Sequence, residues 1–210
     1  MSVHDIKTTV TDITYTRPMA RWEPNARGRL EDAALDLFVE RGFDRTTIAE
    51  IAQRAGLTER TFFRHFADKR EVLFGGSALL RDLLTGAVAE CSPGTAPLEA
   101  VATALERAGA LLQERRSYSC RRQAAIEANE ELRERELVKL ASLADALATA
   151  LRARGVGPAE ASVAAETGIA MFRTAYVAWI AADDTADLPA CIRDSFATLR
   201  VLAVPAHKTP

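Results

Sequence analysis

Apolar residues recur at three- and four-residue steps along almost the entire chain, and no other feature restricts the fold as strongly. This spacing places apolar side chains on one face of an α-helix. The alternation of β-branched and polar residues that is typical of strands is limited to TTVTDITYT near the start. Glycine and proline separate the helical runs, as at Gly42, Gly56 and the segment CSPGTAP. The sequence therefore predicts an all-α fold.

About nine helices are expected from this pattern. Thr47 with Glu50, and Asp68 with Glu71, have the spacing of a capping box, which marks a helix start. Positions that end helices include Gly42 and the stop-and-restart segment GVGP. The expected helices cover residues 25–41, 48–55, 59–66, 69–90, 98–115, 117–129, 130–154, 158–182 and 188–204.

Composition excludes several classes of protein. The chain has 210 residues, a net charge of -2 and three cysteines, which argues against a basic coat protein and a disulfide framework. Its three histidines, His4, His65 and His207, do not suggest a metal site. No run reaches the roughly 18–20 apolar residues that span a bilayer. The first 24 residues lack the apolar run of a secretory signal and are expected to form a flexible arm, so we expect a cytoplasmic protein without a membrane partner.

The most informative segment runs from Thr47 to Phe66. It predicts two short helices joined by a tight turn at Gly56, Leu57 and Thr58, which is the pattern of a helix-turn-helix motif. The glycine permits a positive φ, and the leucine after it fills the angle between the helices. The second helix of such a motif projects its first polar residues into the major groove of DNA.

Ten side chains in and around this motif are candidates for DNA contact. We expect Arg60 to read guanine, because a guanidinium pairs with the O6 and N7 of that base, and Lys69 to bind a phosphate. Glu59 either accepts a hydrogen bond from a cytosine amino group or orients an arginine. A purely structural three-helix bundle is the alternative. The candidates are Arg45, Thr47, Thr58, Glu59, Arg60, Thr61, Phe63, Arg64, His65 and Lys69.

The stretch DAALDLFVERGFDRTTIAEIAQRAGLTERTFFRHFADKREVL resembles the DNA-binding region of tetracycline-repressor-type (TetR/AcrR) transcription regulators. The resemblance is ungapped from Arg27 to about Phe74 and combines the TTIxxIAxxAG helix, the turn and the TFFxHFxxK recognition helix. One position departs from the pattern. The family often has a tyrosine whose hydroxyl binds a phosphate where this chain has Phe63, so that contact is lost or is supplied by Arg64 and His65.

The resemblance implies an architecture and a function. Residues 1–24 would be an arm, 25–68 the DNA-binding domain, and 69–210 a regulatory domain that dimerises through its last two long helices. It implies a ligand-responsive homodimeric repressor that binds a near-palindromic double-stranded operator. The helix over 69–90 would link the two domains as a lever. The implied partners are DNA, a second copy and a small hydrophobic or amphipathic effector, with no cofactor.

Candidate effector contacts lie on two of the later helices. Arg173 interrupts an apolar helix, so it needs either an ion-pair partner, such as Glu166 or a residue across a dimer interface, or an anionic ligand. The aromatic residues beside it fit either a core or dimer seam, or a ligand cage. The candidates are Tyr118, Arg122, Phe172, Arg173, Tyr176 and Trp179.

Two other functions are alternatives to a transcription regulator. An enzyme is disfavoured because the chain has no glycine-rich phosphate loop, no HExxH and no GxSxG. The other alternative is a helix-turn-helix dimer whose regulatory half binds a protein or nothing. A filled core between the helices over 69–90 and 158–182 would favour that alternative, and an enclosed cavity would disfavour it.

Overall fold

The computed structural model describes residues 25–203, and within them it contains only helices, which confirms the all-α prediction. The expected arm, residues 1–24, lies outside the described residues. The described residues form nine α-helices and one short 3₁₀ helix: α1 (Ala26–Arg41), α2 (Ile48–Arg54), α3 (Glu59–His65), η1 (Arg70–Phe74), α4 (Ser77–Glu90), α5 (Pro97–Gln113), α6 (Arg116–Glu127), α7 (Glu130–Ala153), α8 (Pro158–Ala181) and α9 (Leu188–Ala203).

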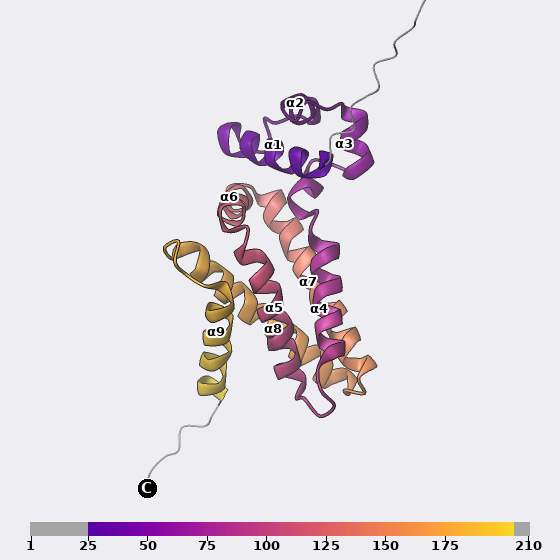
Figure 1. Ribbon diagram of the computed structural model, residues 1–210, viewed down its shortest axis with the longest axis vertical. Helices are drawn as coiled ribbons and strands as arrows, with labels where there is room; N and C mark the ends of the chain where they lie inside the picture. Colours follow the sequence, from indigo (N-terminus) through magenta and orange to yellow (C-terminus); the bar gives the residue numbers. More distant parts are fainter. Residues whose placement is uncertain (1–24, 204–210) are drawn as a thin grey trace, which may run out of the picture.

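The helices form two parts, which we call the head (residues 25–74) and the body (residues 77–203). The head contains α1, α2, α3 and η1 and lies at one end of the long axis (Figure 1). α4 and α7 run away from the head, and α6 lies beneath α1 (Figure 1). α8 packs against α7 on one side and α9 on the other, and α9 also packs on α5.

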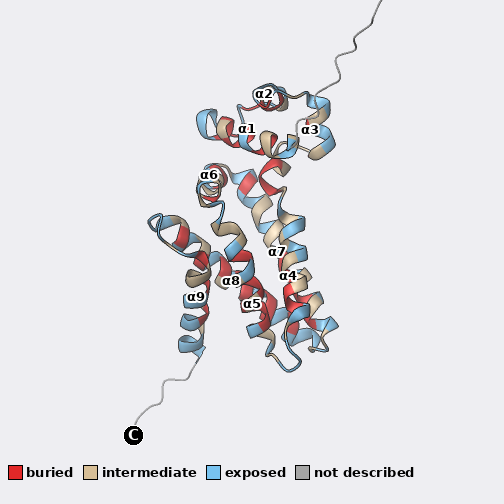
Figure 2. Ribbon diagram, in the orientation of Figure 1, coloured by how far each residue is buried: buried red, intermediate tan, exposed pale blue. Residues whose placement is uncertain are grey.

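Two hydrophobic cores correspond to these parts, and buried residues line both of them in Figure 2. The body core is formed by α4, α5, α7, α8 and α9 around the fully buried Trp179. The head core includes Val72, Leu73 and Phe74, so packing divides the chain at Gly75–Gly76 rather than after residue 68. It also takes three residues from the body, Ala125, Ile126 and Leu132.

The continuous helix expected over 69–90 is the main error of the sequence-based assignment. The backbone forms the short η1, turns at Gly75 and Gly76, and begins α4 only at Ser77. Adjacent glycines weaken a helix because they lose the most backbone entropy when ordered. The Gly75 carbonyl also accepts a hydrogen bond from the Arg27 guanidinium. Only half of the predicted capping box forms, because Asp68 accepts from the N–H groups of Arg70 and Glu71 at 2.8 and 3.1 Å, whereas the Glu71 carboxylate pairs with α7.

One segment, Arg70–Glu90, is long and apolar enough to cross a membrane by length and composition alone. It includes the turn at Gly75–Gly76, and α4 buries Leu84, Ala87 and Val88 in the body core. These are properties of a core helix, and a single segment of this kind is weak evidence for a membrane span.

Candidate nucleic-acid interface

Local sequence signals fix the helix-turn-helix geometry of the head. Thr47 and Glu50 form a complete capping box, in which each side chain accepts from the backbone N–H of the other residue. Gly56 adopts a φ of +64°, which allows the turn between α2 and α3. Thr58 then caps α3 by accepting from the backbone N–H of Thr61 at 3.2 Å.

α3 has a buried face and an exposed face, as the sequence predicts. Phe62 and Phe66 point into the head core, with ring centroids 5.5 Å apart. The opposite face carries Glu59, Arg60, Phe63 and Arg64, all of them exposed. This face is free of other elements within the described chain.

The arginines on this face differ from most others in the protein. Within residues 25–203, most arginines form ion pairs or donate to backbone carbonyls, whereas Arg60 and Arg64 do neither. Arg173 on α8 and Arg200 on α9 also have no such partner among these residues. Arg152 donates only to the Thr149 hydroxyl. Two of the four uncommitted guanidinium groups, those with no contact of any of these kinds within residues 25–203, therefore lie on the exposed face of α3, where they are available for an external anion or base.

The three candidate threonines use their hydroxyl groups inside the protein. The Thr47 hydroxyl lies 2.9 Å from Glu50 Oε2, in addition to its role in the capping box. The hydroxyl oxygens of Thr58 and Thr61 are 3.1 Å apart and share a hydrogen bond. These side chains mainly stabilise the starts of α2 and α3 in the free protein.

Lys69, which the sequence assigns to a phosphate, is engaged within the head. Its Nζ donates to the carbonyls of Phe43 at 2.7 Å and Thr46 at 3.0 Å, and lies 4.1 Å from the centre of the Phe43 ring. It therefore braces the segment between α1 and α2. Arg45 is exposed on that segment, where its Nε donates to the Arg41 carbonyl and its terminal nitrogens remain accessible.

His65 is half-buried at the end of α3, and its Nε2 has no hydrogen-bond partner among the described residues. Burial lowers the pKa of His65 below its usual 6.5, and the positive charges of Arg64 and Arg27 lower it further. The imidazole is therefore neutral at pH 7. Of the two residues suggested to replace the missing tyrosine hydroxyl, only Arg64 offers a positive charge in the free protein.

The six candidate effector residues do not form one site. Phe172, Tyr176 and Trp179 follow one another along the inner face of α8, with ring centroids 5.8 and 5.5 Å apart. Tyr118 packs against the head core instead, and burial raises its pKa to about 12. Arg173 is exposed on the outer face of α8 and forms no ion pair with Glu166, so of the partners that the sequence suggested a residue across a dimer interface or an anionic ligand remains.

Arg122 joins the head to the body. Its Nε donates to the Leu73 carbonyl at 2.8 Å, and its Nη1 lies 2.9 Å from Glu136 Oε1. The guanidinium also stacks on the Phe74 ring. These contacts connect α6 to η1 and α7.

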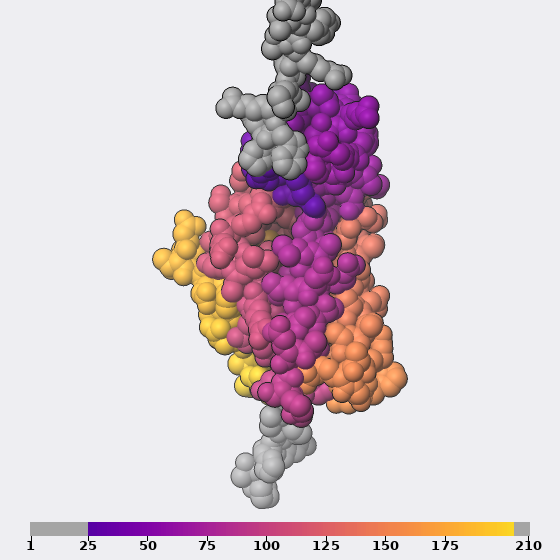
Figure 3. Space-filling view, turned by 45° about the vertical axis from the view of Figure 1, so that its right-hand side comes forward, coloured from indigo at the N-terminus to yellow at the C-terminus, as the bar shows by residue number. Residues whose placement is uncertain are grey.

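A second group of ion pairs at the same junction was not foreseen from the sequence. Glu71 of η1 accepts from Arg135 Nε at 2.7 Å and from Lys139 Nζ at 2.9 Å, both on α7. Arg70 pairs with Glu131 at 2.6 Å. Figure 3 shows α4 between the α5–α6 side and α7, with the head above them. Each pair joins residues more than 60 positions apart, so no local pattern reveals it.

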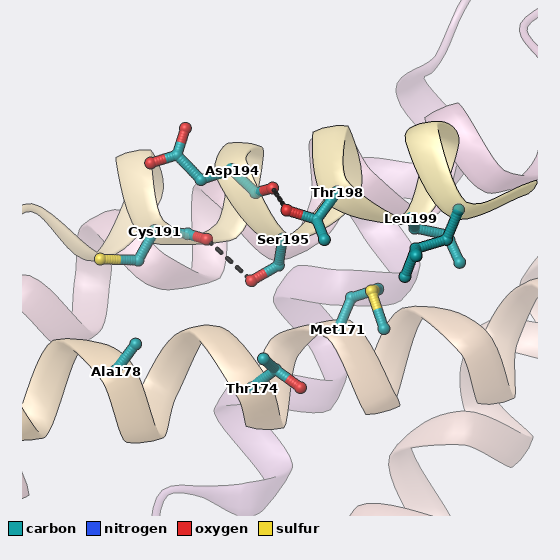
Figure 4. A pocket seen from close by; sticks show the side chains of 9 residues that line it. Met171, Thr174, Ala178, Cys191, Asp194, Ser195, Thr198 and Leu199 are labelled. Atoms are coloured by element: carbon teal, nitrogen blue, oxygen red, sulfur yellow. Dashed lines mark hydrogen bonds between the residues drawn. The ribbon is translucent and has the colours of Figure 1, made fainter.

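Two surface hollows were identified, and neither contains the six candidate effector residues. One, of about 380 Å³, lies where the end of α1 meets α6. The other, of about 430 Å³, is a groove between α8 and α9 whose side chains face each other in Figure 4. It is lined by Met171, Thr174, Ala178, Cys191, Asp194, Ser195, Thr198, Leu199 and Leu202. Within residues 25–203 no cluster of three or more His, Cys, Asp or Glu side chains could hold a metal ion.

The fold and the motif define a helix-turn-helix head on a helical body. Residues 30–74 match the family described as bacterial regulatory proteins, tetR family. This match agrees with the sequence resemblance and lies within the head. Matching curated relatives are described as HTH-type transcriptional regulators.

Individual relatives agree with this assignment. The regulator TcmR of Streptomyces glaucescens is 36% identical over 78 residues, which cover 37% of this chain and 34% of TcmR. The chain thus matches about one third of that protein's length. Among solved structures, Thermus thermophilus FadR with lauroyl-CoA is 24% identical, with a TM-score of 0.53 over 88% of this chain and 98% of FadR. Bacillus subtilis FadR with stearoyl-CoA is 19% identical, with a TM-score of 0.59 over 86% and 99%. These two likenesses concern the fold.

Proposed function

We propose that the protein is a sequence-specific transcriptional regulator that reads its operator with the exposed face of α3. The observation that carries this proposal is the pair of uncommitted guanidinium groups, Arg60 and Arg64, on the outer face of a capped recognition helix. Arginine is the commonest reader of guanine in the major groove. A regulator of this kind acts on DNA in the cytoplasm, and repression is the outcome that its family suggests.

The proposal is tested by the DNA that the protein selects from a random pool. Replacement of Arg60 by alanine is expected to weaken binding by about 1–3 kcal/mol at one operator position and to relax the base preference there. Affinities for operators with each base at that position measure the effect. An equal loss on every sequence would instead assign Arg60 to a phosphate, and failure to select any DNA would contradict the proposed function.

We also propose a homodimer formed through α8 and α9. The outer face of α8 carries small and apolar residues at alternating four- and three-residue steps, the spacing of a seam between packed helices. On α9, Val201 and Leu202 are 75% and 78% exposed, and the groove between the two helices continues this surface. The seam consists of Val163, Thr167, Ala170, Thr174, Val177 and Ala181.

The charges beside this seam suit a two-fold dimer. Glu166 and Arg173 are exposed, have no ion-pair partner among the described residues, and lie on either side of Ala170. In a two-fold interface each contact occurs twice. An axis near Ala170 would bring Glu166 of each protomer toward the partner's Arg173. To reach successive major grooves, the two recognition helices of this dimer would have to lie about 34 Å apart, and the operator would then be a near-palindrome.

For the effector, we propose a small amphipathic anion that seats at Arg122. Arg122, Glu136 and Tyr176 form a polar group in a largely apolar body, and Arg122 already binds a carboxylate there. An anion that competes with Glu136 would act directly on the contact between Arg122 and Leu73 at the head. The two FadR relatives were solved with acyl-CoA molecules, which are anionic amphiphiles. The alternative is a protein partner or no effector, which a filled body core favours.

Lauric acid and dodecanol separate these possibilities because they share a chain and differ in charge. At about 100 times its Kd, lauric acid is expected to raise Tm by roughly 5–10 °C and to release the operator. Arg122→Met should abolish this response, whereas Arg81→Met, which changes an exposed arginine on α4, should preserve it. Thermal unfolding and operator release are the measurements. Equal action of dodecanol would contradict the anion seat, and no response to either compound would favour the alternative.

A further inference from the structure

Phe63 is an exposed aromatic side chain on the outer face of α3. It is 55% exposed, whereas every other phenylalanine, tyrosine or tryptophan between residues 25 and 203 is buried or half-buried. Arg60 precedes it by three positions and Arg64 follows it directly, so Phe63 shares the exposed face of α3 with two uncommitted arginines. A large apolar group in the middle of a polar binding face indicates an apolar contact with the partner.

The Phe63 ring packs on its inner side against a buried aromatic residue. Phe63 meets the ring of Phe62 edge to face, with centroids 5.6 Å apart and planes at 84°. Phe62 is fully buried in the head core and cannot move aside. The Phe63 ring therefore has a rigid neighbour on its inner side, and its outer surface is open to a partner.

The chemistry of the ring restricts what it can recognise. Phenylalanine has no donor or acceptor, so it cannot bind a phosphate oxygen or the polar edge of a base. In the major groove the apolar feature is the 5-methyl group of thymine. We propose that Phe63 packs against a thymine methyl group in each half-site and so selects an A·T pair beside the bases read by Arg60. This inference rests on the proposed function of α3.

Deoxyuridine provides the test, because it keeps the hydrogen bonds of thymine and lacks only the methyl group. Each thymine of the selected operator is replaced in turn, at symmetric positions in both half-sites. One such replacement is expected to weaken binding of the native protein about fourfold per half-site, the value of one buried methyl group.

Variants at Phe63 link this loss to the ring. Phe63→Ala should bind the thymine and deoxyuridine operators equally, at about the affinity of the native protein for the deoxyuridine operator. Phe63→Leu should keep part of the discrimination. Leu79→Ala removes a similarly exposed apolar side chain from α4 and should leave the discrimination between thymine and deoxyuridine unchanged. Because Phe63 is largely exposed, the Tm of Phe63→Ala should stay close to that of the native protein.

Two results would overturn the inference while leaving the proposed function intact. One is full affinity for operators with deoxyuridine at every thymine position. The other is a deoxyuridine effect that persists in Phe63→Ala, which would assign the methyl contact to another residue. If no operator can be selected at all, the proposed function fails first and this inference fails with it.

Discussion

Replacing Val177 by arginine is expected to make the protein monomeric and to lower its operator affinity by at least about 100-fold. Val177 lies in the α8 seam and is exposed in the single chain. In the proposed dimer the new guanidinium would be buried without a partner, which costs several kcal/mol. A monomer binds only one half-site, so it loses the additional affinity that comes from linking two heads.

Light scattering during gel filtration and an operator titration measure this outcome. Leu79→Arg places the same charge on an exposed leucine of α4 and should remain a dimer with native affinity. Charge reversal tests the register of the seam: Glu166→Arg and Arg173→Glu should each weaken the dimer, and the double reversal should restore it. A native-like dimer with Val177→Arg would exclude this face as the interface.

Replacing Glu71 by alanine is expected to lower the free energy of unfolding by about 2 kcal/mol at pH 7. The Glu71 side chain is 19% exposed and accepts from both Arg135 and Lys139. Removing the carboxylate leaves two half-buried cations together without their counter-ion. The estimate lies below the value for a fully buried pair because the cations retain contact with water.

The contribution of Glu71 should also depend on pH. Burial raises the pKa of Glu71, but the hydrogen bonds and charges of Lys139 and Arg135 more than offset burial and hold the pKa below 4.5. A carboxyl with a lowered pKa stabilises the fold above its unfolded pKa, and this stabilisation is lost as pH falls through the folded value. The difference between native protein and Glu71→Gln should therefore shrink below about pH 4.5.

Urea unfolding at several pH values measures both effects. Glu134→Gln is the matched control, because Glu134 is exposed on α7 and has no ion pair within the described residues. It should change stability by no more than about 0.5 kcal/mol at any of these pH values. A Glu71 variant that behaves like this control would show that the junction does not depend on the carboxylate.

Local signals allowed most of the head to be predicted from the sequence. Helix starts are marked by Thr47 with Glu50 and by Thr58, whose capping hydrogen bonds join residues only three positions apart. The turn is marked by Gly56, which adopts a positive φ. The inward Phe62 and outward Phe63 follow from helical periodicity. These features depend only on neighbours in the chain, which is why they could be read without the fold.

The sequence was less informative where distant residues or a second surface decide the outcome. α8 is apolar on its core side and again on the proposed dimer seam, so periodicity could not show which side Arg173 faces. Lys69 finds its carbonyl partners more than 20 positions away. The break at Gly75–Gly76 had a local signal in the glycine pair, but the helix-start pattern at Asp68 and Glu71 and the apolar run favoured a continuous helix.

The shared packing of the head core limits how this protein can be recombined with its relatives. Ala125, Ile126 and Leu132 belong to the body in sequence but to the head core in space. A chimera that transplants only residues 25–74 onto another body would leave part of its apolar surface facing unmatched side chains. The transferable unit is therefore discontinuous, and it consists of the head together with the corner between α6 and α7.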